Sequence, residues 1–115
     1  MATKFVICGA AGRMGRALCE IIRDTEGAEL AAAVEAPGHP ALGSDAGMIA
    51  GIGELGILVS DDYAAVAKED TVTLDFTAPA ATLEHLRTAV AQGAAIAVAT
   101  TGFDGAQEEE LERLA

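Results

Sequence analysis

Three glycines at three-residue spacing come directly after a short apolar run near the start of the chain. The run, Lys4 to Cys8 (KFVIC), is rich in β-forming residues and predicts a buried strand. Gly9, Gly12 and Gly15 then lead into a segment with helical spacing that extends from Arg13 to Asp24. A buried strand that turns through glycines into a helix opens an α/β unit, so this feature points to a fold with a parallel sheet.

The remaining elements continue this alternation of strands and helices. Further strands are expected at Glu29–Glu35, Ile57–Val59, Thr71–Phe76 and, as another buried strand, Ala95–Ala99. Further helices are expected from Ser60 to about Lys68, from Pro79 to Gly93 and after a capping Asp104, with a long connection containing one short helical turn over 36–56. We therefore predict one dinucleotide-binding domain over residues 1–115, with a Rossmann-type, doubly wound parallel sheet and helices on both faces.

The periodicity also predicts which side of each long helix is buried. Aromatic residues make up only 3% of the chain, so the core has to be built from aliphatic side chains. For the first helix the expected apolar face is Met14, Ala17, Leu18, Ile21 and Ile22, and for the helix after Pro79 it is Leu83, Leu86, Ala89 and Val90.

The glycine loop meets the requirements of a pyrophosphate-binding site. Gly9 permits a tight turn, Gly12 allows the backbone to approach phosphate oxygens, and Gly15 allows close packing of the helix on the sheet. The helix N-terminus supplies free N–H groups, and Arg13 adds a positive charge. We expect the cofactor to contact the whole segment of Gly9, Ala10, Ala11, Gly12, Arg13 and Met14, although a loop that merely connects strand to helix is the alternative.

Glu35 stands at the carboxyl end of the second predicted strand, 20 residues after Gly15. A carboxylate there can accept hydrogen bonds from both hydroxyls of an adenosine ribose. It would repel a 2′-phosphate, and Ala36 offers no compensating charge, which leaves Arg13 as the evident candidate. This favours NADH, or dual use of NADH and NADPH; the alternative is a solvated glutamate at the end of a strand.

Two more strand ends fall on the same edge of the predicted sheet, where ligands of open α/β sheets bind. Asp75 is expected to brace the loop backbone there. Phe76 and Thr77, with Ala99, Thr100, Thr101 and Gly102, are candidates to meet the nicotinamide and its ribose. Thr77 as a helix cap and Thr-Thr-Gly as a plain turn form the alternative.

The charge of the chain argues against several other kinds of partner. Eighteen acidic and seven basic residues give a formal net charge of −11, which disfavours nucleic acid and anionic membranes. Cys8 and Cys19 lack metal-ligand spacing, so two core thiols and no metal site are expected. The chain shows neither a membrane span nor a signal peptide, which is typical of a cytoplasmic protein.

Taken together, five motifs resemble the 4-hydroxy-tetrahydrodipicolinate reductase family, also called dihydrodipicolinate reductase. In chain order they are GAAGRMGR (9–16), VE (34–35), LGSDAG (42–47), DFT (75–77) and TTGFD (100–104). The resemblance implies an NAD(P)H-dependent reductase of lysine and diaminopimelate biosynthesis, which transfers hydride to a dihydrodipicolinate precursor. It assigns the glycine loop and Glu35 to the adenosine half of the cofactor, and the two later strand ends to the nicotinamide.

The resemblance also implies what this chain lacks. Family members have a second domain that binds the cyclic dicarboxylate substrate and assembles a homotetramer, and their catalytic histidine and lysine segment has no counterpart here. We therefore expect a fragment that binds cofactor without turnover, with catalytic residues beyond Ala115. Two departures from the family pattern are Ala36, where many members have Arg, and Ala99, where many have Gly.

The same sequence pattern is also compatible with other functions. The chain can be the cofactor domain of another dehydrogenase, such as a homoserine or aspartate dehydrogenase, although the LGSDAG stretch argues against this. It can also be a non-catalytic nucleotide-binding domain, or a methyltransferase that uses the same fold for S-adenosylmethionine.

Overall fold

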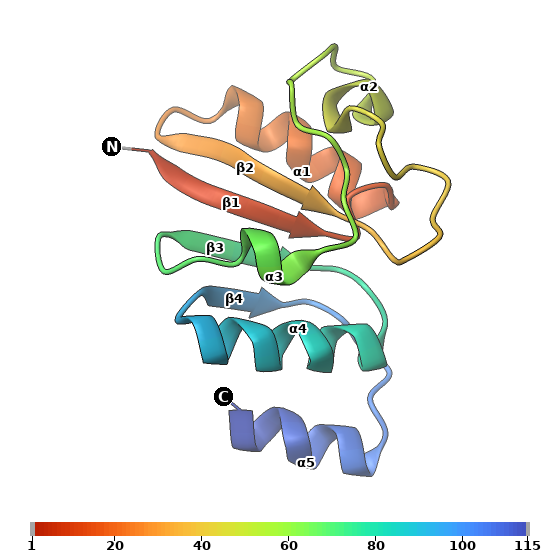
Figure 1. Ribbon diagram of the computed structural model, residues 1–115, viewed down its shortest axis with the longest axis vertical. Helices are drawn as coiled ribbons and strands as arrows, with labels where there is room; N and C mark the ends of the chain where they lie inside the picture. The colour runs from red at the N-terminus through yellow and green to blue at the C-terminus, as the bar shows by residue number, and fades with distance from the viewer. Residues whose placement is uncertain (1, 115) are drawn as a thin grey trace.

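Four parallel strands form the centre of the molecule, and helices lie on both faces of the sheet (Figure 1). The computed structural model describes residues 2–114. The strands are β1 (Thr3–Cys8), β2 (Ala28–Val34), β3 (Thr71–Asp75) and β4 (Ala95–Val98), in the spatial order β2-β1-β3-β4. All three strand pairs are parallel, which confirms the predicted doubly wound, Rossmann-type class.

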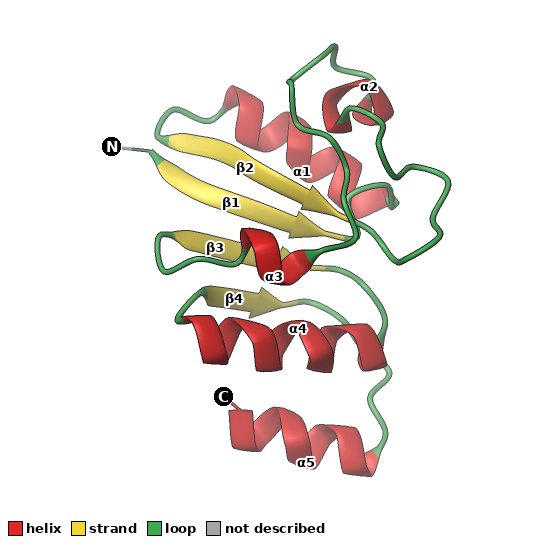
Figure 2. Cartoon of the chain, in the orientation of Figure 1, coloured by secondary structure: helices red, strands yellow, loops and turns green. Residues whose placement is uncertain are grey.

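Five helices connect or follow these strands in the described part of the chain (Figure 2). They are α1 (Arg13–Asp24), α2 (Ala46–Ala50), α3 (Tyr63–Val66), α4 (Pro79–Gln92) and α5 (Gly105–Leu114). Pro79 begins α4 and Gly93 ends it in a left-handed conformation, as expected from their backbone preferences. At α5 the Asp104 carboxylate accepts the Gln107 N–H at 2.8 Å, so the predicted cap is present. None of the described helices has the length and hydropathy needed to span a bilayer.

The core is divided into two clusters because successive residues of β1 point to opposite faces of the sheet. Val6 and Cys8 pack with residues of α3 and α4, including Tyr63 and Ala89. Ile7 packs on the other face, in a cluster that includes Cys19 of α1. Both thiols are buried, as predicted, and they belong to clusters on opposite sides of the sheet.

The predicted buried face of α1 is partly wrong. The buried residues are Gly15, Cys19 and Ile22, whereas Ala17 is exposed and Met14 and Ile21 are 52% and 58% exposed. Positions 15, 19 and 22 follow the i, i+4, i+7 spacing of one narrow stripe, and the absence of a side chain at Gly15 turns that stripe toward the strand-to-helix loop. On α4, Val90 is likewise exposed rather than buried.

Two strand predictions also need correction. Ala95–Val98 is an edge strand without a fully buried residue, because α4 covers one of its faces and leaves Ala95 and Ala97 exposed on the other. Ile57–Val59 is no strand of the sheet. Leu58 makes an isolated bridge with Asp45, and the adjacent Ser60 makes a parallel bridge with Val34 at the carboxyl end of β2.

The short helix after Ser60 is also smaller than predicted. It runs only from Tyr63 to Val66, and its N-cap is Asp62, whose carboxylate accepts the Ala65 N–H at 3.2 Å. The strand order places β1 between β2 and β3, so the glycine loop at the end of β1 lies between the ends of these two neighbours. That switch point in strand order is where ligands of open α/β sheets bind.

Candidate nucleotide-binding site

The glycine loop makes a tight turn at the carboxyl end of β1, and its geometry explains two of the three glycines. Gly9 has φ of 87°, and a Cβ there would lie 2.6 Å from the carbonyl oxygen of Phe76. At Gly15 a Cβ would lie 2.7 Å from Cα of Ala10. Gly15 therefore allows α1 to approach the loop itself, rather than the sheet as predicted.

The N-terminus of α1 is an open set of backbone donors. Gly12 is the N-cap and offers no side-chain bond. Within residues 2–114, no hydrogen bond uses the N–H groups of Arg13, Met14 or Gly15. A twelve-residue helix with unpaired N–H groups attracts an anion through those donors and through the helix dipole.

Glu35 joins the end of β2 to this loop. One carboxylate oxygen, Oε2, accepts the N–H of Ala11 at 2.8 Å, and Oε1 accepts the N–H of Ala36 at 3.3 Å. The side chain is only 11% exposed. Its position is therefore set by backbone donors on both sides, next to the free N-terminus of α1.

A cavity of about 570 Å³ opens beside Glu35 and the glycine loop. Its size is within the usual range for a site that encloses most of a small ligand. Its walls come from the ends of β1, β2 and β3, from the start of α3 and from α4, with the lining residues Gly9, Ala11, Gly12, Val34–Pro37, His39, Asp61–Ala64, Phe76–Ala78, Ala81, Glu84, His85 and Thr88.

Asp75 stabilises the turns that follow β3 and β4 at the edge of the cavity. It is fully buried, and its Oδ1 accepts the N–H and hydroxyl of Thr77 at 3.0 and 2.6 Å and the hydroxyl of Thr82 at 3.1 Å. The Thr100 hydroxyl in turn accepts the Thr77 N–H at 3.2 Å. Asp75 thus braces the loop backbone, as predicted, and the hydrogen bonds tie the ends of β3 and β4 together.

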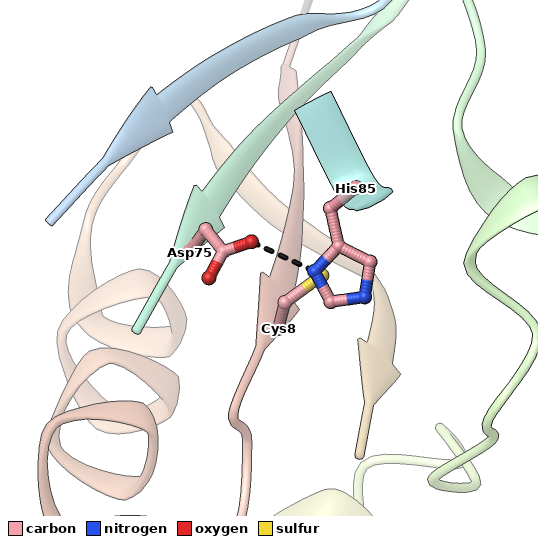
Figure 3. Close-up of side chains that lie close together, drawn as sticks. All are labelled: Cys8, Asp75 and His85. Carbon is pink, nitrogen blue, oxygen red and sulfur yellow. Dashed lines mark hydrogen bonds and ion pairs between the residues drawn. The ribbon is translucent and has the colours of Figure 1, made fainter. Parts of the chain in front are cut away.

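The other oxygen of Asp75 pairs with a histidine that the sequence analysis did not assign to the site. Figure 3 shows His85 of α4 directed at Asp75, with Cys8 close to both. Oδ2 and His85 Nδ1 are 2.8 Å apart, and because an ionised carboxylate only accepts, Nδ1 carries the proton. Burial acts to raise the pKa of Asp75, but the hydrogen bonds from His85 and Thr77 outweigh it and lower that pKa.

Cys8, Asp75 and His85 place three potential metal-ligand atoms within 4.8 Å of one another. The chemistry of the cluster does not fit a metal site. Burial, with the nearby charges of Asp75 and Glu35, raises the pKa of the Cys8 thiol well above its ordinary value, which disfavours the thiolate that a metal needs. Both oxygens of Asp75 already accept hydrogen bonds. We interpret the cluster as a structural network under the cavity.

The structure places the predicted site residues in three settings. Residues that line the cavity are Gly9, Ala11, Gly12, Glu35, Phe76 and Thr77. Arg13 and Met14 lie exposed at the start of α1, and Ala99, Thr101 and Gly102 are exposed after β4. Ala10 is buried and its N–H donates to Val34, so it belongs to the scaffold of the loop. Thr77 does not cap α4, whose N-cap is Ala78.

Several cavity residues were missed by sequence reasoning, notably His39, Asp61, Glu84 and His85. The only local signal for His85 is its place on α4 ten residues after Asp75, and His39 lies in an irregular, proline-rich connection. Neither position has a spacing that identifies it as part of a site.

Comparison with known proteins gives a consistent result. The family model described as "Dihydrodipicolinate reductase, N-terminus" matches residues 3–115. A protein named 4-hydroxy-tetrahydrodipicolinate reductase from Magnetococcus marinus is 44% identical over 111 residues, which cover 96% of this chain and 41% of the relative. A protein of the same name from Alkalilimnicola ehrlichii is 46% identical over 115 residues, which cover 100% of this chain and 43% of the relative.

A solved structure supports the fold. The dipicolinate-bound dihydrodipicolinate reductase from Paenisporosarcina sp. TG-14 matches with a TM-score of 0.69 at 21% sequence identity, covering 99% of this chain and 43% of that chain. The chain described here therefore spans about two fifths of the length of these relatives.

Proposed function

Because this chain belongs to the dihydrodipicolinate reductase family, whose amino-terminal part it matches, we propose that it binds the NAD(P)H from which the complete enzyme transfers hydride to a dihydrodipicolinate precursor. The observation that carries the proposal is the pairing of two features at one edge of the sheet. The N-terminus of α1 presents free N–H groups, and Glu35 lies beside it, fixed by the Ala11 N–H. One feature suits a pyrophosphate and the other suits a ribose diol.

The residues of this chain have binding and positioning roles in the proposal. Gly12, Arg13 and Met14 receive the pyrophosphate at the start of α1, with Ala10 and Ala11 shaping the loop, and Glu35 accepts hydrogen bonds from the adenosine ribose. Phe76 and Thr77, together with Ala99 to Gly102, form the nicotinamide end of the site. This assignment is supported by the hydrogen bond from the Thr77 N–H to the Thr100 hydroxyl, which joins the segments that follow β3 and β4.

The bound dinucleotide supplies the hydride, and this chain supplies its orientation. The residues that bind the dicarboxylate substrate and transfer the proton belong, in this proposal, to the part of the family's length that this chain does not span. The homotetramer and the cytoplasmic location expected above stay predictions.

The charges around the cavity favour NADH over NADPH. Glu35 stands at the ribose position and Ala36 brings no cation, while Asp61, Asp62 and Glu84 add further carboxylates to the lining. A 2′-phosphate placed among these groups would be repelled. We expect NADH to bind at least as tightly as NADPH.

Fluorescence titration tests the proposal directly. The reduced nicotinamide is excited at wavelengths that protein side chains do not absorb, and because the chain contains no Trp, no tryptophan emission is transferred to it. Adding the chain to NADH, and in a separate titration to NADPH, should enhance and shift that emission in a saturable way, and isothermal titration calorimetry should measure the affinity for S-adenosylmethionine, which lacks this fluorophore. Binding of S-adenosylmethionine alone would refute the reductase assignment, and a marked NADPH preference lost on Arg13→Ala would show that Arg13 outweighs Glu35.

A further inference from the structure

His39 lies in the wall of the cavity, four residues after Glu35, in the connection that follows β2. Its ring is held by the backbone, because the N–H of Ala41 donates to Nδ1 at 2.9 Å. A ring nitrogen that accepts carries no proton, so the neutral imidazole has its proton on Nε2. The loop therefore fixes both the orientation of the ring and the atom that can donate.

The donor of His39 points toward the Glu35 carboxylate but does not reach it. Nε2 lies 4.0 Å from Oε1 of Glu35, which is too long for a direct hydrogen bond. A hydroxyl oxygen about 2.8 Å from each of these atoms would join them with an angle of about 90° at that oxygen. Such a hydroxyl donates its proton to Glu35 and accepts one from His39, so the gap matches a group that is both donor and acceptor.

We propose that His39 and Glu35 together recognise the 2′-hydroxyl of the cofactor's adenosine ribose, with Nε2–H of His39 donating to the 2′ oxygen. This inference rests on the proposed function. The assignment to the 2′ position follows from the two ends of the carboxylate: Oε2 bonds the glycine loop, where the pyrophosphate sits, and Oε1 faces His39. The ribose 3′ carbon is nearer to the 5′ phosphate in the covalent structure, so the 3′-hydroxyl faces the loop and the 2′-hydroxyl faces His39.

The surroundings make this a site for a hydroxyl and not for a phosphate. The same cavity is lined by four carboxylates, those of Glu35 directly after β2, Asp61 and Asp62 ahead of α3, and Glu84 of α4, and His85 is its other imidazole. His39 brings a neutral donor among them, and a second proton on Nδ1 would break its hydrogen bond with Ala41. A 2′-phosphate would meet several carboxylates and one neutral donor, whereas a hydroxyl satisfies both partners.

The test compares NADH with its analogue that lacks the 2′-hydroxyl on the adenosine ribose, in the unmodified chain and in His39→Ala. We expect His39→Ala to weaken NADH binding by about fivefold to tenfold, the usual effect of losing one neutral hydrogen bond. The deoxy analogue should bind the two chains within about twofold. His39→Gln, which offers an amide donor at a similar reach, should recover part of the loss.

The controls separate recognition from loop structure. Pro40→Ala changes the neighbouring residue of the same connection and should leave the affinities for both nucleotides unchanged. Equal weakening of NADH and of the deoxy analogue by His39→Ala would mean that His39 only shapes the loop, and would overturn this inference alone. If the unmodified chain binds neither nucleotide, the proposed function fails first and this inference fails with it.

Discussion

Gly12 and Gly15 belong to one motif but meet different physical demands. At Gly15 an added Cβ would collide with backbone of the loop, 2.7 Å from Cα of Ala10, whereas at Gly12 the nearest atom is the Gly9 carbonyl oxygen at 3.3 Å. Gly15→Ala should therefore lower the free energy of unfolding by about 1–3 kcal/mol, the usual cost of overpacking. Gly12→Ala should change it by less than about 1 kcal/mol.

Gly12→Ala, the variant expected to affect stability less, should have the larger effect on cofactor binding. Gly12 is exposed at the N-cap of α1, so a methyl group there stands in the path of the proposed pyrophosphate. We expect Gly12→Ala to weaken NADH binding by about tenfold or more, as for loss of charge-assisted bonds. Urea unfolding and NADH titration of the two variants measure both effects. Normal NADH affinity in Gly12→Ala would place the pyrophosphate elsewhere.

Asp75 is a buried carboxylate beneath the cavity, and it accepts hydrogen bonds through both oxygens. Its removal in Asp75→Ala leaves the partly buried His85 Nδ1–H without its acceptor and removes the carboxylate that accepts from Thr77 and Thr82. We expect a loss of about 3 kcal/mol or more in the free energy of unfolding, with a smaller loss in Asp75→Asn. A melting temperature equal to that of the unmodified chain would show that water replaces the carboxylate without cost.

The lowered pKa of Asp75 predicts a particular dependence on pH. A carboxyl whose folded pKa lies below its unfolded value of about 3.9 stabilises the fold fully above that value, and the contribution is lost as the pH falls through the folded pKa. The difference in unfolding free energy between the unmodified chain and Asp75→Asn should therefore shrink below about pH 4. Urea titrations at a series of pH values provide the measurement, and a difference independent of pH would contradict the assignment.

At the scale of elements, α2 depends on a single side chain. The helix has only five residues, too few to be stable by itself. The Asp45 carboxylate caps it by accepting the Gly47 and Met48 N–H groups at 2.8 and 3.2 Å, and it also accepts from Leu55 and Gly56 at 3.0 and 2.7 Å. These bonds, led by the one from Leu55, lower the pKa of Asp45. The aspartate of the LGSDAG motif therefore closes a loop onto a helix.

Asp45→Ala should unfold α2 and the following loop locally while the sheet persists. Hydrogen exchange measures this: the amides of Gly47, Met48, Leu55 and Gly56 should lose protection, and those of β1 should keep it. Asp45→Asn, which retains one acceptor oxygen, should show a smaller loss. Unchanged exchange at all four amides in Asp45→Ala would mean that packing against α1 is sufficient to hold α2.

At the scale of the whole molecule, the site is assembled from segments that are far apart in the sequence. The glycine loop, the Glu35 region and the Phe76–Thr77 turn meet only when β1, β2 and β3 are paired. A ligand bound there stabilises the folded chain as a unit. At a free NADH concentration 100 times the dissociation constant, the gain should be about 2.7 kcal/mol.

Thermal unfolding at increasing NADH concentration checks this linkage. The midpoint should rise continuously with the logarithm of ligand concentration beyond saturation. Gly12→Ala is the matched control, because it should keep the fold and, with about tenfold weaker binding, lose about half of the shift at that NADH concentration. A midpoint that does not move with NADH in the unmodified chain would contradict cofactor binding by the folded state.

The sequence by itself determined the features that depend on near neighbours along the chain. The apolar run at β1, the glycine turn, the helical spacing of α1 and α4 and the placing of Glu35 at the end of β2 were all predicted, because strand, turn and helix preferences act over a few residues. Repetition of these units was enough to predict a parallel sheet of the Rossmann type.

The tertiary structure alone decided which distant groups meet and how much of each element is covered. It made β4 a half-exposed edge strand, and it buried Cys19 of α1 while leaving Met14 exposed. The burial of a side chain depends on which other elements pack against that face. It also brought His39 within 4.0 Å of Glu35 and His85 within 2.8 Å of Asp75. Contacts such as these depend on the paths of the loops and helices, which the periodicity of the sequence does not specify.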